Sequence, residues 1–251
     1  MFEIQLTKGS TPSGGAFVTA FPSVGMVGTI AGNFVAESLK MGRIAYVLSD
    51  EIPPAALVQE GIPSYPLRIL GYKKVSVMTS EFQIPLALSS QLAKTLLEWT
   101  NANGYDQIVG LEGLMTAQEA APEPEKDARV FGVGSTAHAR DLLENAKIEQ
   151  FKMGMITGVS GALLSEGERS NRDVICLLVE ANAMFPDARG AAKLVESVSR
   201  LLPSIQVDLQ ELYKEADLIE QNVKETVERT KEMLAARQGQ AERLGRSYMY
   251  G

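Results

Sequence analysis

Short runs of β-branched and apolar residues alternate with helical patterns from residue 16 to about residue 203. Gly15–Ala20 and Arg43–Ser49 are typical of strands, and Val24–Lys40 between them is typical of a helix. The run Val174–Val179 is apolar at every position, as expected for a central strand that helices cover on both faces. The alternation predicts an α/β fold in which a mostly parallel sheet lies between helical layers.

Further elements complete the same pattern. Leu67–Leu70 and Val75–Thr79 flank a short polar segment and predict a hairpin. Leu86–Asn101 predicts a helix that stops near Gly104. The remaining predicted elements of this region are the strands 106–111, 128–133 and 153–157 and the helix 136–145.

The composition changes after Pro203. Residues 208–243 contain no proline, and Gly239 is their only glycine. A narrow apolar stripe at three- and four-residue spacing predicts a long helix, suited to a helical hairpin or a short coiled coil; it comprises Leu209, Leu212, Ala216, Ile219 and Val223. The alternative is that this stripe packs on its own domain. We therefore expect an α/β domain at 1–203 and, at 204–251, a helical arm with a flexible C-terminal tail.

Composition and charge exclude several classes of function. The net charge is −7 and no stripe of Lys or Arg is present, so we expect no nucleic-acid binding. No window approaches the roughly 20 uninterrupted apolar residues of a membrane-spanning helix, and the first residues lack the pattern of a secretory signal. The single cysteine, Cys176, excludes an internal disulfide and a cysteine-cluster metal site. These features predict a cytoplasmic protein.

The glycine-rich segment Phe21–Asn33 lies between a predicted strand and a predicted helix. It lacks the spacing of a dinucleotide-binding loop and the Gly-Lys-Ser/Thr of an NTPase loop, so we predict no cofactor there. Gly25, Gly28 and Gly32 recur at helical spacing, which favours close packing of the helix over anion binding. The start of the helix near Ser23 would still tolerate an anion.

No constellation of catalytic residues is evident. His138 is the only histidine, no Gly-x-Ser-x-Gly elbow occurs, and Cys176 lies in a wholly apolar strand. Glu112 and Glu180 follow predicted strands at the edge where open α/β sheets bind ligands. A pocket near Ser23, Glu112 and Glu180 would suit the alternative function, a hydrolase or phosphorylase-like enzyme. The absence of a nucleophile and base favours a protein that is not an enzyme.

Three motifs in order resemble the proteasome assembly chaperone family that occurs in archaea. They are Phe21–Gly28, Gly158–Leu164 and Phe185–Ala192, and the resemblance covers roughly residues 15–205. It implies an α/β fold like that of the phosphorylase/hydrolase class, a symmetric homo-oligomer, and binding to the α-subunit ring of the proteasome core as assembly chaperone or ATP-independent activator. The motifs resemble structural landmarks, so the resemblance carries no catalytic residue and no cofactor.

The sequence ends Met249-Tyr250-Gly251. Part of the family carries a C-terminal hydrophobic-Tyr-X (HbYX) tripeptide through which proteasome activators dock, and this ending is similar to it. Tyr250 offers a large apolar ring with a hydroxyl, Met249 an adaptable apolar contact, and the carboxylate of Gly251 a charge that a lysine can pair. We therefore predict that these three residues bind the proteasome, and that several tails on one oligomer bind together.

Overall fold

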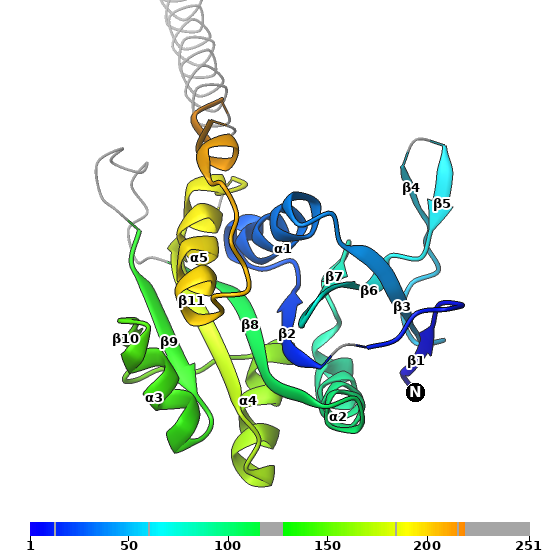
Figure 1. Ribbon diagram of the computed structural model, residues 1–251, viewed down its shortest axis with the longest axis horizontal. Coiled ribbons are helices and arrows are strands. Elements are labelled where there is room, and N and C mark those ends of the chain that lie inside the picture. The colour runs from blue at the N-terminus through cyan, green and yellow to red at the C-terminus, as the bar shows by residue number, and fades with distance from the viewer. Residues whose placement is uncertain (13, 60, 116–127, 184, 215, 219–251) are drawn as a thin grey trace, which may run out of the picture.

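A sheet of nine strands runs through the described residues and carries helices on both faces (Figure 1). This computed structural model describes residues 1–12, 14–59, 61–115, 128–183, 185–214 and 216–218. The strands of the main sheet are β1 (Glu3–Leu6), β2 (Gly15–Ala20), β3 (Gly42–Leu48), β6 (Leu67–Tyr72), β7 (Val75–Ser80), β8 (Tyr105–Met115), β9 (Val130–Gly134), β10 (Glu149–Gln150) and β11 (Val174–Ala181). The helices are η1 (Val24–Met26), α1 (Val27–Ser38), α2 (Leu86–Ala102), α3 (Ala137–Asn145), α4 (Gly158–Ser170) and α5 (Ala188–Leu201).

The strand order is β1-β3-β6-β7-β2-β8-β11-β9-β10. The four central strands β7, β2, β8 and β11 are parallel to one another. Parallel strands need a crossover connection, and helices supply it here: α2 connects β7 to β8, and α4 leads into β11. Antiparallel pairs flank this centre: the predicted β6–β7 hairpin and the pairs β1–β3 and β3–β6 on one side, and β9–β11 on the other, where β10 then adds a parallel edge to β9. The predicted α/β class is confirmed, and the sheet is mixed around a parallel centre.

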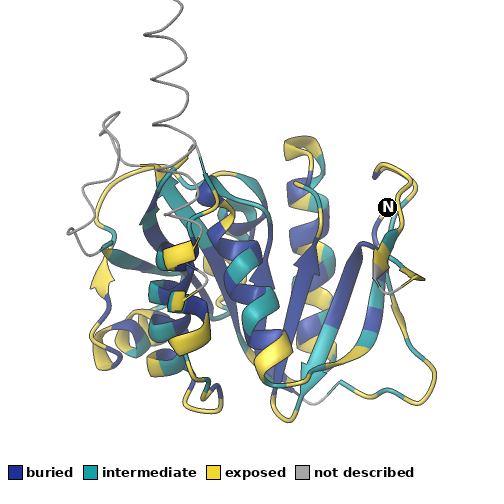
Figure 2. Cartoon of the chain, turned by 90° about the horizontal axis from the view of Figure 1, so that it is seen from above, coloured by how far each residue is buried: buried dark blue, intermediate teal, exposed yellow. Residues whose placement is uncertain are grey.

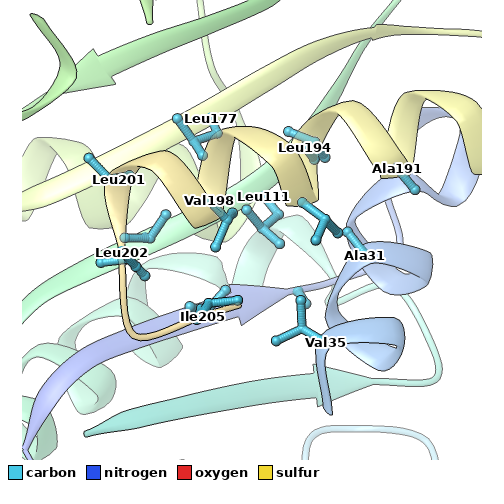
Figure 3. Close-up of a cluster of buried hydrophobic side chains, with 14 of the residues drawn as sticks. Ala31, Val35, Leu111, Leu177, Ala191, Leu194, Val198, Leu201, Leu202 and Ile205 are labelled. Atoms are coloured by element: carbon cyan, nitrogen blue, oxygen red, sulfur yellow. The ribbon is translucent and has the colours of Figure 1, made fainter. Parts of the chain in front are cut away.

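Two layers of helices cover the sheet. Helices α1, α3 and α5 share one apolar cluster with the residues of β11 at 175, 177 and 179. Helices α2 and α4 share a second cluster, on the other face, with Val174 of the same strand. In Figure 3, Leu194 and Val198 of α5 point toward Leu111 of β8 and Ala31 of α1. Figure 2 shows the buried residues along the central strands and the exposed ones on the outer sides of the helices.

The start of the C-terminal stripe packs on the α/β body. Residues 210–214 and 216–218 are helical, and Leu212 and Ala216 are each 1% exposed within the cluster of α1 and α5. The guanidinium of Arg189 on α5 lies 2.7 Å from the carboxylate of Asp217. For these residues the structure agrees with the alternative that the stripe packs on its own domain. The rest of the predicted long helix lies outside the described residues.

Several features differ from the predicted elements, and β1, α4 and α5 have no predicted counterpart. The predicted strand 153–157 is wrong, because the parallel ladder with β9 is formed by β10 and ends where the backbone N–H of Phe151 donates to the carbonyl of Gly132. Met153 and Met155 beyond it are 91% and 87% exposed. A hairpin of β4 (Leu57–Gln59) and β5 (Ile62–Ser64) projects beside the main sheet (Figure 1) and has no counterpart in the predicted elements.

Candidate functional site

The predicted docking residues Met249, Tyr250 and Gly251 lie outside the described residues. The other predicted location, the edge where the parallel strands end, is described. It contains Ser23 and Glu112, and the three motifs that carry the family resemblance meet there.

The first motif packs on the end of β8 through Ser23. The hydroxyl of Ser23 accepts hydrogen bonds from the backbone N–H groups of Gly113, at 3.2 Å, and Gly28, at 3.4 Å. A β-carbon at Gly113 would lie 2.2 Å from the carbonyl oxygen of Val24, so only glycine allows the two backbones to approach this closely. Ser23 therefore holds the turn between β2 and α1 on the sheet, and its hydroxyl is already engaged by backbone donors.

The third motif joins the first through Asp187. The carbonyl of Gly25, a residue in the left-handed region at φ 62°, accepts from the backbone N–H of Asp187 at 2.8 Å. One carboxylate oxygen of Asp187 caps α5 by accepting from the N–H of Gly190 at 2.7 Å. The other oxygen accepts from the N–H of Asn182 at 3.1 Å. Asp187 thus fixes the start of α5 against the turn that precedes α1.

The second motif reaches the same strand from the opposite face of the sheet. The hydroxyl of Ser160, in the first turn of α4, donates to the carboxyl group of Glu112 at 2.6 Å. A β-carbon at Gly110 would lie 2.9 Å from this hydroxyl, so the glycine makes room for Ser160. The first and second motifs therefore meet at residues 110–113 of β8, and the third motif joins them through Gly25 of the first.

Burial dominates the electrostatics around Glu112. It raises the pKa of the Glu112 carboxyl group to about 7, and the hydrogen bond from Ser160 opposes this rise. Burial also raises the pKa of the Cys176 thiol, and the neighbouring charge of Glu112 adds to that effect. Ser160 is 1% exposed and Cys176 is fully buried, so neither is open to a substrate. The burial of Cys176 agrees with its position in a wholly apolar strand.

Glu180 does not join Glu112 in an acid–base pair. Its carboxylate accepts from the backbone N–H of Arg129 at 3.3 Å, on the side of β9. Glu112 instead lies in register with Leu178 of β11 and contacts α4. Among the residues that the structure describes, no hydrogen bond or ion pair links Ser23, Glu112 and Glu180, so the pocket of the enzyme alternative is not assembled from them.

His138 lies at the opposite end of the sheet. Its Nδ1 is 2.6 Å from a carboxylate oxygen of Asp173, which directly precedes β11. The hydrogen bond and charge of Asp173 raise the pKa of the exposed imidazole. The other oxygen of Asp173 accepts from the hydroxyl of Thr136, the N-cap of α3. His138 is therefore part of a capping arrangement, and sequence reasoning missed Asp173 because the two residues are 35 positions apart.

The glycines of α1 serve packing. A β-carbon at Gly28 would lie 2.6 Å from the carbonyl oxygens of Phe21 and Leu111, and one at Gly32 would lie 2.2 Å from the β-carbon of Ala20. The packing prediction is confirmed for these two residues, whereas Gly25 precedes α1 and forms the turn.

Open cavities lie at two places among the described residues. A cavity of about 320 Å³ lies between the first turns of α2 and α4, and one of about 390 Å³ lies between β3 and the β4–β5 hairpin. Across the described ranges, no group of three His, Cys, Asp or Glu residues could hold a metal ion. None of the helices described is both long and apolar enough to cross a membrane.

Comparisons with known proteins agree on one family. Residues 17–227 match the model of the PAC2 family. An uncharacterized protein of Methanocaldococcus jannaschii is 30% identical over 220 residues, which are 87% of each chain. The crystal structure of Pyrococcus furiosus PbaA, described as an archaeal homolog of proteasome-assembly chaperone, matches with a TM-score of 0.81 and 30% identity over 97% of this chain and 98% of that one. P. furiosus PbaB, described as an archaeal proteasome activator, shares the fold with a TM-score of 0.75 and 20% identity over 90% and 98% of the two chains.

Proposed function

The chain belongs to the PAC2 family, and on that basis we propose that it binds the proteasome core particle in the cytoplasm as an assembly chaperone or an ATP-independent activator. The observation that carries the proposal is the likeness to PbaA over nearly the whole of both chains. The sequence contains no Gly-Lys-Ser/Thr loop for a nucleotide, so binding alone would drive the effect.

The proposed contact with the α-subunit ring is the ending Met249-Tyr250-Gly251. Tyr250 would fill an apolar pocket between α-subunits, and the carboxylate of Gly251 would pair with a lysine at its base. Met249 would adapt to the pocket wall. Because Gly251 has no side chain, nothing on this residue would obstruct that pairing.

We further propose that residues 204–251 form an arm that carries this tail, and that the chain is a homo-oligomer that presents several arms. The anchoring of Leu212 and Ala216 in the core gives the arm a fixed origin on the α/β domain. A single tripeptide binds weakly, whereas linked tails raise one another's effective concentration and so the overall affinity.

We propose that the protein is not an enzyme. The buried positions of Ser160 and Cys176 and the separate partners of Glu112 and Glu180 support this proposal. The hydrolase or phosphorylase-like alternative would need an accessible nucleophile beside a base.

The test uses purified archaeal core particles and the full chain, compared with a chain that lacks residues 249–251. We expect the full chain to bind and the shortened chain to lose most of its binding, in a surface-based binding assay with peptide turnover recorded in parallel. Faster turnover would identify an activator, and binding without faster turnover an assembly chaperone. Equal binding by both chains would contradict docking through the tail. Light scattering should give a mass well above the 27.1 kDa of one chain; a monomer would contradict the multivalent arrangement.

A further inference from the structure

A carboxyl group without a cation lies where α4 rests on the sheet. Glu112 of β8 is partly buried, and its hydrogen bond from Ser160 connects the strand to the first turn of α4. Within the described part of the chain, Glu112 forms no ion pair. A charge in this position is therefore stabilised by one hydroxyl and by the weakly positive end of the helix alone.

Among the described residues, the groups that interact with Glu112 come from α4 and β11 and carry no positive charge. Ser160 comes from α4, and Cys176 of β11 lies close enough for the charge of Glu112 to raise the pKa of its thiol. Glu180 of the same strand lies on the side of β9, where its carboxylate accepts from the backbone N–H of Arg129. The charged residues of α4 lie at its other end, at 166, 168 and 169.

A buried hydroxyl shares this space without a partner. Thr19 of β2 is 1% exposed, and its hydroxyl makes no hydrogen bond to any described residue. A β-carbon at Gly110 would lie 2.9 Å from the hydroxyl of Ser160 and 3.4 Å from that of Thr19, so both hydroxyls border the same small space. A polar space beneath the first turn of a helix is a place where water enters when the helix lifts.

We propose that the protonation state of Glu112 controls how firmly the first turn of α4 is held on the sheet. The neutral acid needs little hydration, so α4 stays packed. The carboxylate needs water, and lifting the first turn of α4, whose Gly158 and Gly161 border the cavity between α2 and α4, would admit it. Exposed Met153 and Met155 lie on the segment that leads into this turn. Helix α4 and the cavity therefore loosen as the pH rises through neutrality.

The direction of this pH effect follows from the pKa values of Glu112 in the packed and in the open state of α4. In the packed state the pKa of Glu112 is about 7, against an ordinary value of 4.5 for an open, hydrated carboxyl group. The packed state therefore binds the proton more tightly, and opening of α4 becomes more favourable as the pH rises between these values. Between about pH 6 and about pH 8 these pKa values give roughly a tenfold increase in the population of the open state.

Amide hydrogen exchange of residues 158–163 tests the proposal, with rates corrected for the intrinsic pH dependence of exchange. In the wild-type chain we expect protection to fall roughly tenfold between about pH 6 and about pH 8. The variant Glu112→Gln keeps an acceptor for Ser160 and cannot ionise, so its protection should not change with pH. The matched control Glu180→Gln should behave like the wild type. The same loss of protection in Glu112→Gln, or its absence in Glu180→Gln, would overturn the proposal.

A second measurement needs no variant. The side-chain carboxyl carbon of Glu112 in the wild-type chain, followed by NMR, should titrate near pH 7, and the amide shifts of the first turn of α4 should follow the same midpoint. A midpoint near the ordinary value of 4.5 would contradict the proposal.

Discussion

A methyl group added at Gly32 tests the close contact between α1 and the central strand β2. The β-carbon of an alanine at this position would lie 2.2 Å from the β-carbon of Ala20, whereas carbon atoms in contact are about 3.5 to 4 Å apart. Neither atom is the end of a flexible side chain, so α1 itself must move by more than about 1 Å. The move would disturb Val27, Ala31 and Val35, which α1 buries in the core.

Two opposing effects determine how much Gly32→Ala changes the free energy of unfolding. Alanine in the middle of a helix is favoured over glycine by about 1 kcal/mol. Overpacking of a rigid core costs about 1 to 3 kcal/mol. Since the overlap is with a central strand held by β7 and β8, we expect the overpacking cost to lie in the upper part of this range, at about 2 to 3 kcal/mol, so that Gly32→Ala lowers the free energy of unfolding by about 1 to 2 kcal/mol.

The double variant separates steric overlap from other causes. Ala20→Gly alone should cost about 1 to 2 kcal/mol, because it removes a buried methyl group and loosens the strand. In Ala20→Gly with Gly32→Ala the new methyl group takes the place of the lost one, so the two costs should fall short of additivity by about 1 to 3 kcal/mol. Urea unfolding of the wild type, the two single variants and the double variant measures these differences in the free energy of unfolding. Additive costs, or a stabilised Gly32→Ala, would refute the packing argument.

Three further predictions concern single residues. Ser23→Ala leaves two backbone N–H groups without their acceptor and should lower the free energy of unfolding by about 1 to 3 kcal/mol, while the exposed Ser90→Ala should have no measurable effect. The pKa of His138, measured by NMR, should lie above 6.5 and should fall in Asp173→Asn, and an unchanged pKa would contradict the contact. Because this pKa is raised, the stabilisation by the His138–Asp173 pair is complete below pH 6.5 and is lost as the pH rises through the raised pKa. The pKa of Glu112 is raised to about 7, so the stabilisation by its neutral form is complete below pH 4.5 and declines up to about pH 7. Above pH 7, Glu112→Gln should therefore be more stable than the wild type by up to roughly 3 kcal/mol. Equal midpoints of urea unfolding for the two chains at that pH would contradict the burial of the charge.

The parts of the fold that depend on local pattern could be predicted from the sequence. The apolar run at 174–179 predicted a strand covered on both faces, and the glycines at 28 and 32 predicted close packing of α1. Apart from the β6–β7 hairpin, the antiparallel pairs could not be predicted, because the pairing of β1 with β3 and of β9 with β11 joins segments about 40 residues apart. The strand predicted at 153–157 has apolar residues at alternate positions, but Met153 and Met155 are exposed and no strand in the described part of the chain pairs with them.

The contacts of the candidate site could likewise be predicted only where a local pattern indicates them. The sequence pattern places Ser23 and Glu112 near the ends of predicted strands, and Ser160 and Asp187 lie within the second and third motifs. What the sequence could not reveal is that Ser160 binds Glu112 across 48 positions and that Asp187 reaches back to Gly25. These contacts depend on which strands are neighbours, and no local pattern encodes that order.

Docking through the C-terminal tail is the central claim, and the chain supplies its own control. Tyr248 and Tyr250 are two residues apart, and only Tyr250 occupies the second position of the final tripeptide. The decisive measurement is the dissociation constant for proteasome core particles of the full chain, Tyr250→Ala and Tyr248→Ala. We predict that Tyr250→Ala weakens binding by at least about tenfold, as expected for an aromatic anchor, and that Tyr248→Ala leaves it nearly unchanged. Equal effects of the two substitutions, or no effect of Tyr250→Ala, would contradict the account.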